Sequence, residues 1–186
     1  MLNDKRMRLI KSDNGINYYL FTPSVFSLYY KDSKHVRREE PSHRYTVSHQ
    51  LHMLWYALHG GGYRILYLEK DHEILSYVIF VRANNQIISG CEKDDYYTIF
   101  LWTYPEFRGR GLATMMANAM LHDLCLPYNH FYKTISKDNY ASMKVAEKSG
   151  FFVKCESEKT GLLHTIHFTD HGTQLLYCYQ NEKRQG

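Results

Sequence analysis

The chain has few cysteines, and they follow no recognisable pattern. They are spread through the 186 residues without the short paired spacing of a zinc site or the density of a disulfide scaffold, at Cys91, Cys125, Cys155 and Cys178. We therefore expect reduced, partly buried thiols rather than cross-links.

Long apolar runs are also missing. No stretch approaches the roughly 20 apolar residues of a membrane-spanning helix, and residues 1–6 lack the apolar region of a signal peptide. We expect a soluble, cytoplasmic protein with no membrane partner. A chain of 186 residues is long enough to bury one core, so we expect a single domain over residues 1–186.

Histidine is plentiful, but its spacing does not favour a metal site. His164 and His167 are three apart on an expected strand, which places them on opposite faces. His49 and His52 are three apart on an expected helix, but no carboxylate or third histidine accompanies them. We predict that no metal is bound, with the helical pair as the less favoured alternative.

Basic residues are not concentrated enough to indicate a nucleic-acid partner. The net charge is +4, and basic residues outnumber acidic ones near the start of the chain. Glu39 and Glu40 interrupt that basic run, and no zinc-finger, helix-turn-helix or RNA-binding pattern occurs. We expect a solvated basic face and no nucleic-acid partner, with a basic rim near an acidic cofactor as the intermediate alternative.

What is present is a glycine-rich turn between a strand and a helix. Residues 96–103 are β-branched and aromatic, and residues 112–126 carry apolar side chains at helical spacing before Pro127. Between them lies Phe-Arg-Gly-Arg-Gly-Leu-Ala, residues 107–113. Glycines allow a tight turn, and the following helix N-terminus attracts anions. The turn predicts a cradle for a phosphate or pyrophosphate.

Two familiar phosphate loops do not fit this segment. It has no Gly-Lys-Ser/Thr, and Thr114 stands where a dinucleotide fingerprint has its third glycine. What fits is Arg-x-x-Gly-x-Ala at Arg108, Gly111 and Ala113, which resembles the acetyl-CoA pyrophosphate motif of the GNAT acetyltransferases. The alternative is a plain surface turn with solvated arginines.

A second segment strengthens the resemblance. Residues 139–151 resemble the other GNAT signature, an asparagine, a short helix and a Gly-Phe pair that enters a strand. Asp138 or Asn139 is suited to cap that helix, and Gly150 to the left-handed position after it. Residues 131–136 are expected to form the preceding strand.

The remaining elements also follow the GNAT order over nearly the whole chain. We expect an α/β GNAT fold with a mixed sheet of about six or seven strands flanked by helices. The resemblance implies splayed central strands that hold acetyl-CoA. Around residues 12–15 we expect either a short hairpin or one strand and its approach. The other expected elements are helices at 23–30 and 47–59, a loop at 31–44, and strands at 63–68, 74–81, 87–88, 151–153, 161–168 and 174–179.

The resemblance also implies the cofactor contacts. Backbone groups of Leu101, Trp102 and Thr103 would contact the pantetheine. Asn139 would approach the reactive end, and Lys144 the outer phosphates. The amides that would hold the pyrophosphate belong to Arg108, Gly109, Arg110, Gly111, Leu112 and Ala113.

The implied reaction is acyl transfer to an amine by direct attack in a ternary complex. It needs a base, an oxyanion donor and a way to protonate the thiolate. Many members carry a tyrosine acid where this chain has Ala146, and some carry a glutamate where it has Thr134. The catalytic residues are therefore left open, with Tyr97 and Asp95 as weak candidates.

The acceptor is not readable from the sequence. We expect an acetyl-CoA-dependent N-acetyltransferase acting on a small-molecule primary amine, such as an amino sugar. A peptide N-acetyltransferase and a non-catalytic CoA-binding module are the alternatives. The loop at 31–44 and the helix at 47–59 would form the acceptor wall, and a homodimer is left open.

Overall fold

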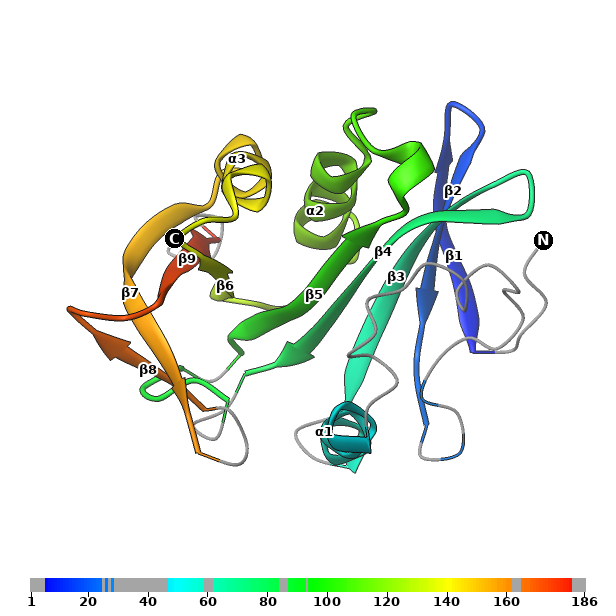
Figure 1. The fold of residues 1–186 in the computed structure, drawn as a ribbon. Helices are drawn as coiled ribbons and strands as arrows, with labels where there is room; N and C mark the ends of the chain where they lie inside the picture. Colours follow the sequence, from blue (N-terminus) through cyan, green and yellow to red (C-terminus); the bar gives the residue numbers. More distant parts are fainter. Residues whose placement is uncertain are drawn as a thin grey trace. The chain divides into compact units, whose positions relative to one another are not determined.

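The computed structural model describes residues 6–24, 26, 28, 47–58, 62–83, 87–92, 94–161 and 165–181 (Figure 1). Internal contacts divide the chain into two compact units. The first unit is Met1–Phe80 with Phe100–Leu124, and the second is Val81–Ile99 with Cys125–Gly186. That residues 1–186 form one domain stays a prediction.

The first unit contains three strands and most of a fourth, β4, whose last two residues belong to the second unit. They are β1 (Met7–Asp13), β2 (Ile16–Phe21), β3 (Tyr63–Lys70) and β4 (Glu73–Arg82), with β1–β2 and β2–β3 pairing antiparallel. Of the two arrangements expected around residues 12–15, the hairpin is confirmed. Its two-residue turn has Asn14 and Gly15 at φ 49° and 75°, the left-handed conformation that Asn-Gly hairpin turns favour.

Helix α1 (Val47–Leu58) confirms the expected helix but not its buried face. The apolar spacing places Leu51, Leu54, Trp55 and Leu58 on one side. In the structure Met53 is fully buried, whereas Leu51 and Leu58 are exposed. Periodicity locates an apolar stripe, but the neighbouring elements decide which part of it is covered.

Helix α2 (Leu112–His122) is shorter than predicted. It ends ahead of Leu126 because Asp123 leaves the helix and Cys125 adopts a positive φ of 51°. Pro127 also disfavours helical geometry at the residue before it. The prediction placed the stop at the proline, and the chain turns away several residues earlier.

Two predicted elements are wrong over their described residues. No helix starts at Pro23, because Thr22 N donates to Arg6 O at 3.2 Å and Ser24 forms a β-bridge. Ile87 and Ile88 form no strand; Ile88 makes only an isolated bridge to Ile166. The expected loop at 31–44 lies outside the described residues.

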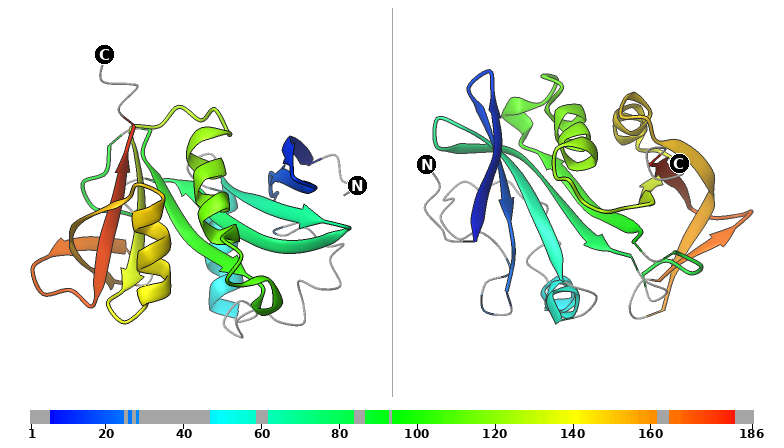
Figure 2. Two further views of the ribbon diagram at one scale, coloured as in Figure 1. Left: turned by 90° about the horizontal axis from the view of Figure 1, so that it is seen from above. Right: turned by 180° about the vertical axis from the view of Figure 1, so that it is seen from behind.

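The second unit contains most of the remaining strands and one helix. Strand β5 (Tyr96–Thr103) starts in it and continues into the first unit. The other elements are β6 (His130–Ser136), α3 (Tyr140–Lys148), β7 (Phe152–Thr160), β8 (Thr165–Thr169) and β9 (Gln174–Gln180). Figure 2 shows α3 lying along β6 and β9.

The strands are hydrogen-bonded in the order β1-β2-β3-β4-β5-β6-β9-β7-β8. Strands β5 and β6 run parallel, whereas β6–β9, β9–β7 and β7–β8 run antiparallel. The predicted mixed α/β sheet is confirmed, and the described residues form nine strands rather than six or seven.

Candidate functional site

The cradle begins where β5 ends beside β4. Tyr104 N donates to Leu75 O at 3.1 Å, which keeps the end of β5 attached to the sheet. A 3-10 turn, η2 (Pro105–Phe107), follows. The chain then reaches the two glycines and enters α2, so the predicted order of strand, turn and helix is confirmed.

Gly109 and Gly111 both have a φ of 76°. This left-handed region suits glycine because it lacks a Cβ atom. A Cβ added at either position would meet nothing within 4 Å, so open space faces both residues. Gly111 is the N-cap of α2, and no side chain in the described part of the protein caps this helix. The first N–H groups of α2 therefore lack a side-chain acceptor and suit an anion.

The two arginines of the turn are exposed and held by the turn itself. Arg108 Nε donates to Thr103 O at 3.1 Å, and its guanidinium lies 4.7 Å from the Trp102 ring centre. Arg110 Nη2 donates to Glu106 O at 3.2 Å. A guanidinium has five N–H donors, so these bonds orient both groups and leave donors for a phosphate.

The last residues of β5 are also held by a side chain that sequence reasoning missed. Ser76 Oγ on β4 donates to Trp102 O at 2.7 Å and lies 3.0 Å from Thr103 Oγ1. Ser76 is fully buried. A cofactor that contacts Leu101–Thr103 would therefore use the N–H groups or the second lone pairs of these carbonyls.

The second signature is built as predicted in the second unit. Asn139 is the N-cap of α3, and its Oδ1 accepts from Ser142 N at 3.1 Å. Gly150 follows the helix with a φ of 81°. Lys144 lies on the exposed side of α3. Asn139 thus has a structural role as a cap, and its cofactor contact and that of Lys144 stay predictions.

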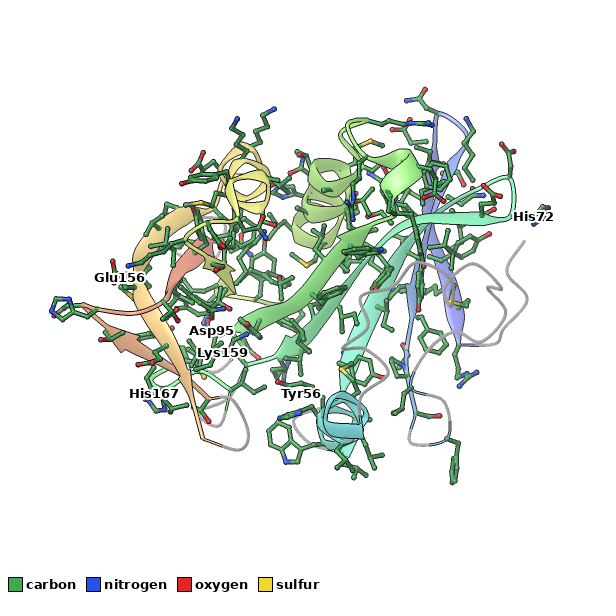
Figure 3. The ribbon with its side chains drawn as sticks, viewed as in Figure 1. Tyr56, His72, Asp95, Glu156, Lys159 and His167 are labelled. Atoms are coloured by element: carbon green, nitrogen blue, oxygen red, sulfur yellow. The ribbon has the colours of Figure 1, made fainter. Side chains whose placement is uncertain are left out.

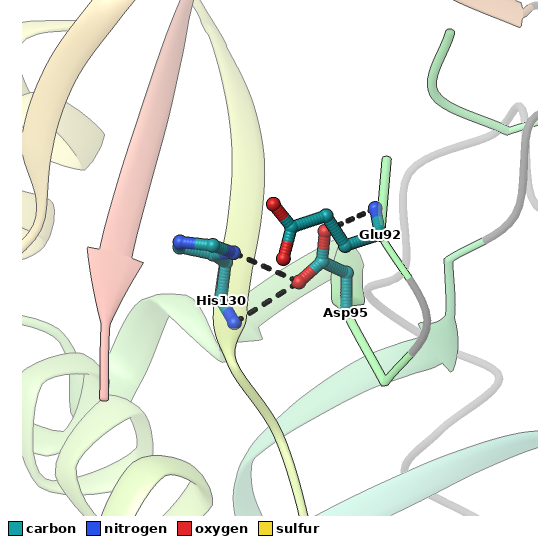
Figure 4. A group of neighbouring side chains, drawn as sticks. All are labelled: Glu92, Asp95 and His130. Carbon is teal, nitrogen blue, oxygen red and sulfur yellow. Dashed lines mark hydrogen bonds and ion pairs between the residues drawn. The ribbon is translucent and has the colours of Figure 1, made fainter. Parts of the chain in front are cut away.

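The two weak catalytic candidates have different surroundings. Tyr97 is buried, and its hydroxyl lies 2.9 Å from Thr134 Oγ1 on β6. Asp95 is fully buried. Its carboxylate accepts from Glu92 N at 2.7 Å, His130 N at 3.1 Å and His130 Nδ1 at 2.9 Å (Figure 4). With both oxygens bonded, Asp95 is placed to orient the loop and the His130 ring.

Glu92, Asp95 and His130 also form the one metal-type group found among the described residues. One ligand atom from each lies within 4.8 Å of the others. The sequence did not indicate this group because His130 is distant in the chain and joins it through the β5–β6 pairing. The Nδ1–Oδ1 hydrogen bond accounts for the arrangement without a metal. His52 and His167 do not belong to this group, and the side chains of His49 and His164 lie outside the described residues.

The structure thus combines a mixed α/β sheet with a glycine turn that leads into a helix without a side-chain cap. Residues 24–151, more than half of the chain, match the acetyltransferase (GNAT) family. The chain therefore belongs to the acetyltransferase (GNAT) family. It is accordingly an acyltransferase whose acetyl donor is acetyl-CoA.

Solved structures with the same fold are distant in sequence. The microcin C7 self-immunity acetyltransferase MccE, solved with acetyl-CoA and AMP, is 16% identical with a TM-score of 0.55, and the match covers 91% of this chain and 94% of that one. The IAA acetyltransferase from Bacillus cereus is 6% identical with a TM-score of 0.51, over 71% and 85% of the two chains. No curated protein sequence matches the chain.

No helix in the described ranges has the length and apolarity needed to cross a membrane.

Proposed function

We propose that the protein is an N-acetyltransferase that transfers the acetyl group of acetyl-CoA to a primary amine of a small molecule. The observation that supports it most is the uncapped N-terminus of α2, with Gly109 and Gly111 both at a φ of 76°. A pyrophosphate needs backbone N–H donors and close approach, and this turn offers both.

The cofactor contacts of the proposal follow the residues already described. The amides of Arg108 to Ala113 hold the pyrophosphate, and the guanidinium groups of Arg108 and Arg110 add charge. Backbone groups of Leu101, Trp102 and Thr103 bind the pantetheine. The family resemblance adds Asn139 and Lys144 from the second signature.

In the proposed reaction the acceptor amine, in its neutral form, attacks the thioester carbonyl directly. The amine nitrogen bonds to the carbonyl carbon, and the carbon–sulfur bond then breaks. Tyr97 stays a candidate because its hydroxyl and Thr134 Oγ1 form a pair that can relay a proton. The buried, fully bonded Asp95 is proposed as a positioning residue for His130 rather than as the base.

The proposal is tested by incubating the protein with acetyl-CoA and a panel of amines. The panel contains amino sugars, polyamines, aminoglycosides and peptides with free N-termini. Thiol release reports turnover, and mass spectrometry identifies the acetylated amine. Turnover of peptides alone would favour the peptide N-acetyltransferase. Acetyl-CoA binding without turnover of any amine would favour a CoA-binding module.

A further inference from the structure

Ser76 on β4 holds two successive residues at the end of β5. Its hydroxyl donates to Trp102 O at 2.7 Å and lies 3.0 Å from Thr103 Oγ1. A serine hydroxyl carries one hydrogen. Because that hydrogen is on the Trp102 carbonyl, the Thr103 hydroxyl is the donor in the second bond. Ser76 is fully buried, and both bonds fasten the end of β5 to β4.

The same two residues hold Arg108. The central carbon of its guanidinium lies 4.7 Å from the Trp102 ring centre, and its Nε donates to Thr103 O at 3.1 Å. Backbone groups of successive strand residues point to opposite edges of the strand. The Trp102 carbonyl and Tyr104 N both bond to β4, the latter through Leu75 O. The Thr103 carbonyl therefore points away from β4, and Arg108 meets it there.

The Arg108 guanidinium depends on these two contacts for its orientation. It is exposed, and its side chain makes no other hydrogen bond or ion pair within the described ranges. An exposed arginine loses rotamer freedom when it binds a ligand, and fixing it beforehand lowers that cost. Since Nε bonds to Thr103, the N–H groups of both terminal nitrogens are left for phosphate oxygens.

The second arginine of the turn is held in a different way. Arg110 Nη2 donates to Glu106 O at 3.2 Å, and its guanidinium lies 5.5 Å from the Phe107 ring centre. Both partners belong to the 3-10 turn η2 rather than to the two residues that Ser76 holds. Arg110 is therefore a matched comparison, with the same charge and the same exposed turn but no connection through Ser76.

We propose that Ser76 is a positioning residue, which orients the Arg108 guanidinium for the phosphate groups of acetyl-CoA through Trp102 and Thr103. The identity of the ligand rests on the proposed N-acetyltransferase function. All four residues, the glycine turn and the start of α2 belong to the first unit, so the role of Ser76 needs no contact between the two units.

The first test needs no ligand. The Nε–H signal of Arg108 in a nitrogen-15 NMR spectrum reports the hydrogen bond to Thr103, because a bonded N–H exchanges with water more slowly than a free one. Arg108→Lys removes this signal and so identifies it. In Ser76→Ala the Nε–H should exchange at least about fivefold faster, as the weakening of one hydrogen bond implies. An unchanged exchange rate would overturn the proposal.

The second test is a double-mutant cycle on the Kd of CoA, measured by titration calorimetry. Ser76→Ala should raise Kd by about 5- to 10-fold, because one side chain is no longer preorganised. Arg108→Ala should raise it by about tenfold or more. Added to Arg108→Ala, Ser76→Ala should change Kd by less than about twofold, since no guanidinium is left to orient. Added to Arg110→Ala, it should keep its full effect.

A serine with a merely structural role would give a different cycle. Ser76→Ala would then weaken CoA binding equally in the Arg108→Ala and Arg110→Ala backgrounds, and that result would contradict the proposal, as would an unchanged Kd in Ser76→Ala alone. If Ser76→Ala does not fold, Thr103→Val takes its place in the cycle and is judged in the same way. It removes only the hydroxyl that bonds to Ser76 and keeps the shape of the side chain.

The two proposals fail in different ways. If the wild type binds CoA but acetylates no amine, the proposed function fails, and the cycle still decides the role of Ser76. If amines are acetylated and Ser76→Ala acts equally in both arginine backgrounds, only the role of Ser76 fails. If the wild type does not bind CoA, both proposals fail.

Discussion

At the residue scale, Lys133 couples the stability of the protein to pH. Its pKa is lowered from 10.5 to about 8 by burial. Between these values the unfolded chain binds more protons than the folded one, so the free energy of unfolding rises with pH across that window. Below pH 8 the cost of burying the charge is fully present.

We predict that Lys133→Met stabilises the protein at pH 7 by on the order of 3 kcal/mol. The advantage should shrink as the pH rises from about 8 to 10.5, because the wild-type lysine then loses its charge when folded. Urea unfolding at several pH values measures the difference in free energy of unfolding between the variant and the wild type. Lys159→Met is the control, because Lys159 is exposed on β7 (Figure 3). A gain that does not change with pH would show that Lys133 is not desolvated in the folded state.

The hydrogen bonds of Asp95 lead to a second prediction at the residue scale, on the stability of Asp95→Asn. Its carboxylate accepts three N–H hydrogen bonds in a fully buried position. Asp95→Asn places an amide NH₂ against one of these donors, which should cost about 2 kcal/mol or more in stability. Denaturant unfolding measures the loss. If the variant kept full stability but lost all turnover under folding conditions, Asp95 would be a catalytic group rather than a positioning residue.

At the element scale, α2 and the turn before it form the proposed anion-binding site. The helix starts without a side-chain cap, and both glycines have a φ of 76°. These features belong to the backbone, which is why the glycine positions matter more there than the identity of neighbouring side chains.

Acetyl-CoA should raise the melting temperature of the wild type because it binds the folded state. We predict that Gly111→Asp abolishes this shift, since its carboxylate repels the pyrophosphate and its side chain fills the open approach. Gly161→Asp is a matched control, because Gly161 also has a positive φ, 71°, and open space around its Cβ position. An undiminished melting-temperature shift in Gly111→Asp would show that the glycine turn does not bind the cofactor.

At the scale of the whole molecule, the proposed reaction requires no thiol nucleophile and no metal. Changing each of the four cysteines to alanine should leave turnover within about two- to threefold, because the amine attacks acetyl-CoA directly. Thiol release measures the turnover of each variant. Mass spectrometry of the protein after mixing with acetyl-CoA alone shows whether a cysteine becomes acetylated. An acetylated cysteine that passes its acetyl group to the amine would rule out direct attack.

Chelators should also leave turnover unchanged. A result against this prediction would point first to Glu92, Asp95 and His130, since the ligand atoms of this group lie within 4.8 Å of one another. Activity is measured after dialysis against a chelator, with and without added zinc, in the wild type and in Glu92→Gln. Zinc-dependent recovery in the wild type alone would place a metal at this group.

The sequence by itself determined the elements whose signals are local. The strand, glycine turn and helix around residues 96–122 depend on nearby residues, as do the Asn139 cap and Gly150, and all of these were predicted. The segment after Pro23 was not, because a distant partner, Arg6, bonds to Thr22 and keeps the chain out of a helix. The end of α2 was also missed, because the positive φ of Cys125 has no clear signal in the sequence.

Only the tertiary structure decided which polar side chains are buried together. His130 meets Asp95, and Ser76 meets Trp102 and Thr103, through strand pairings that no spacing in the sequence reveals. Lys133 is one lysine among many in the sequence, and its position at the end of the β5–β6 pairing leaves it buried without an anion. Burial depends on what packs over a residue, and that is a property of the folded chain.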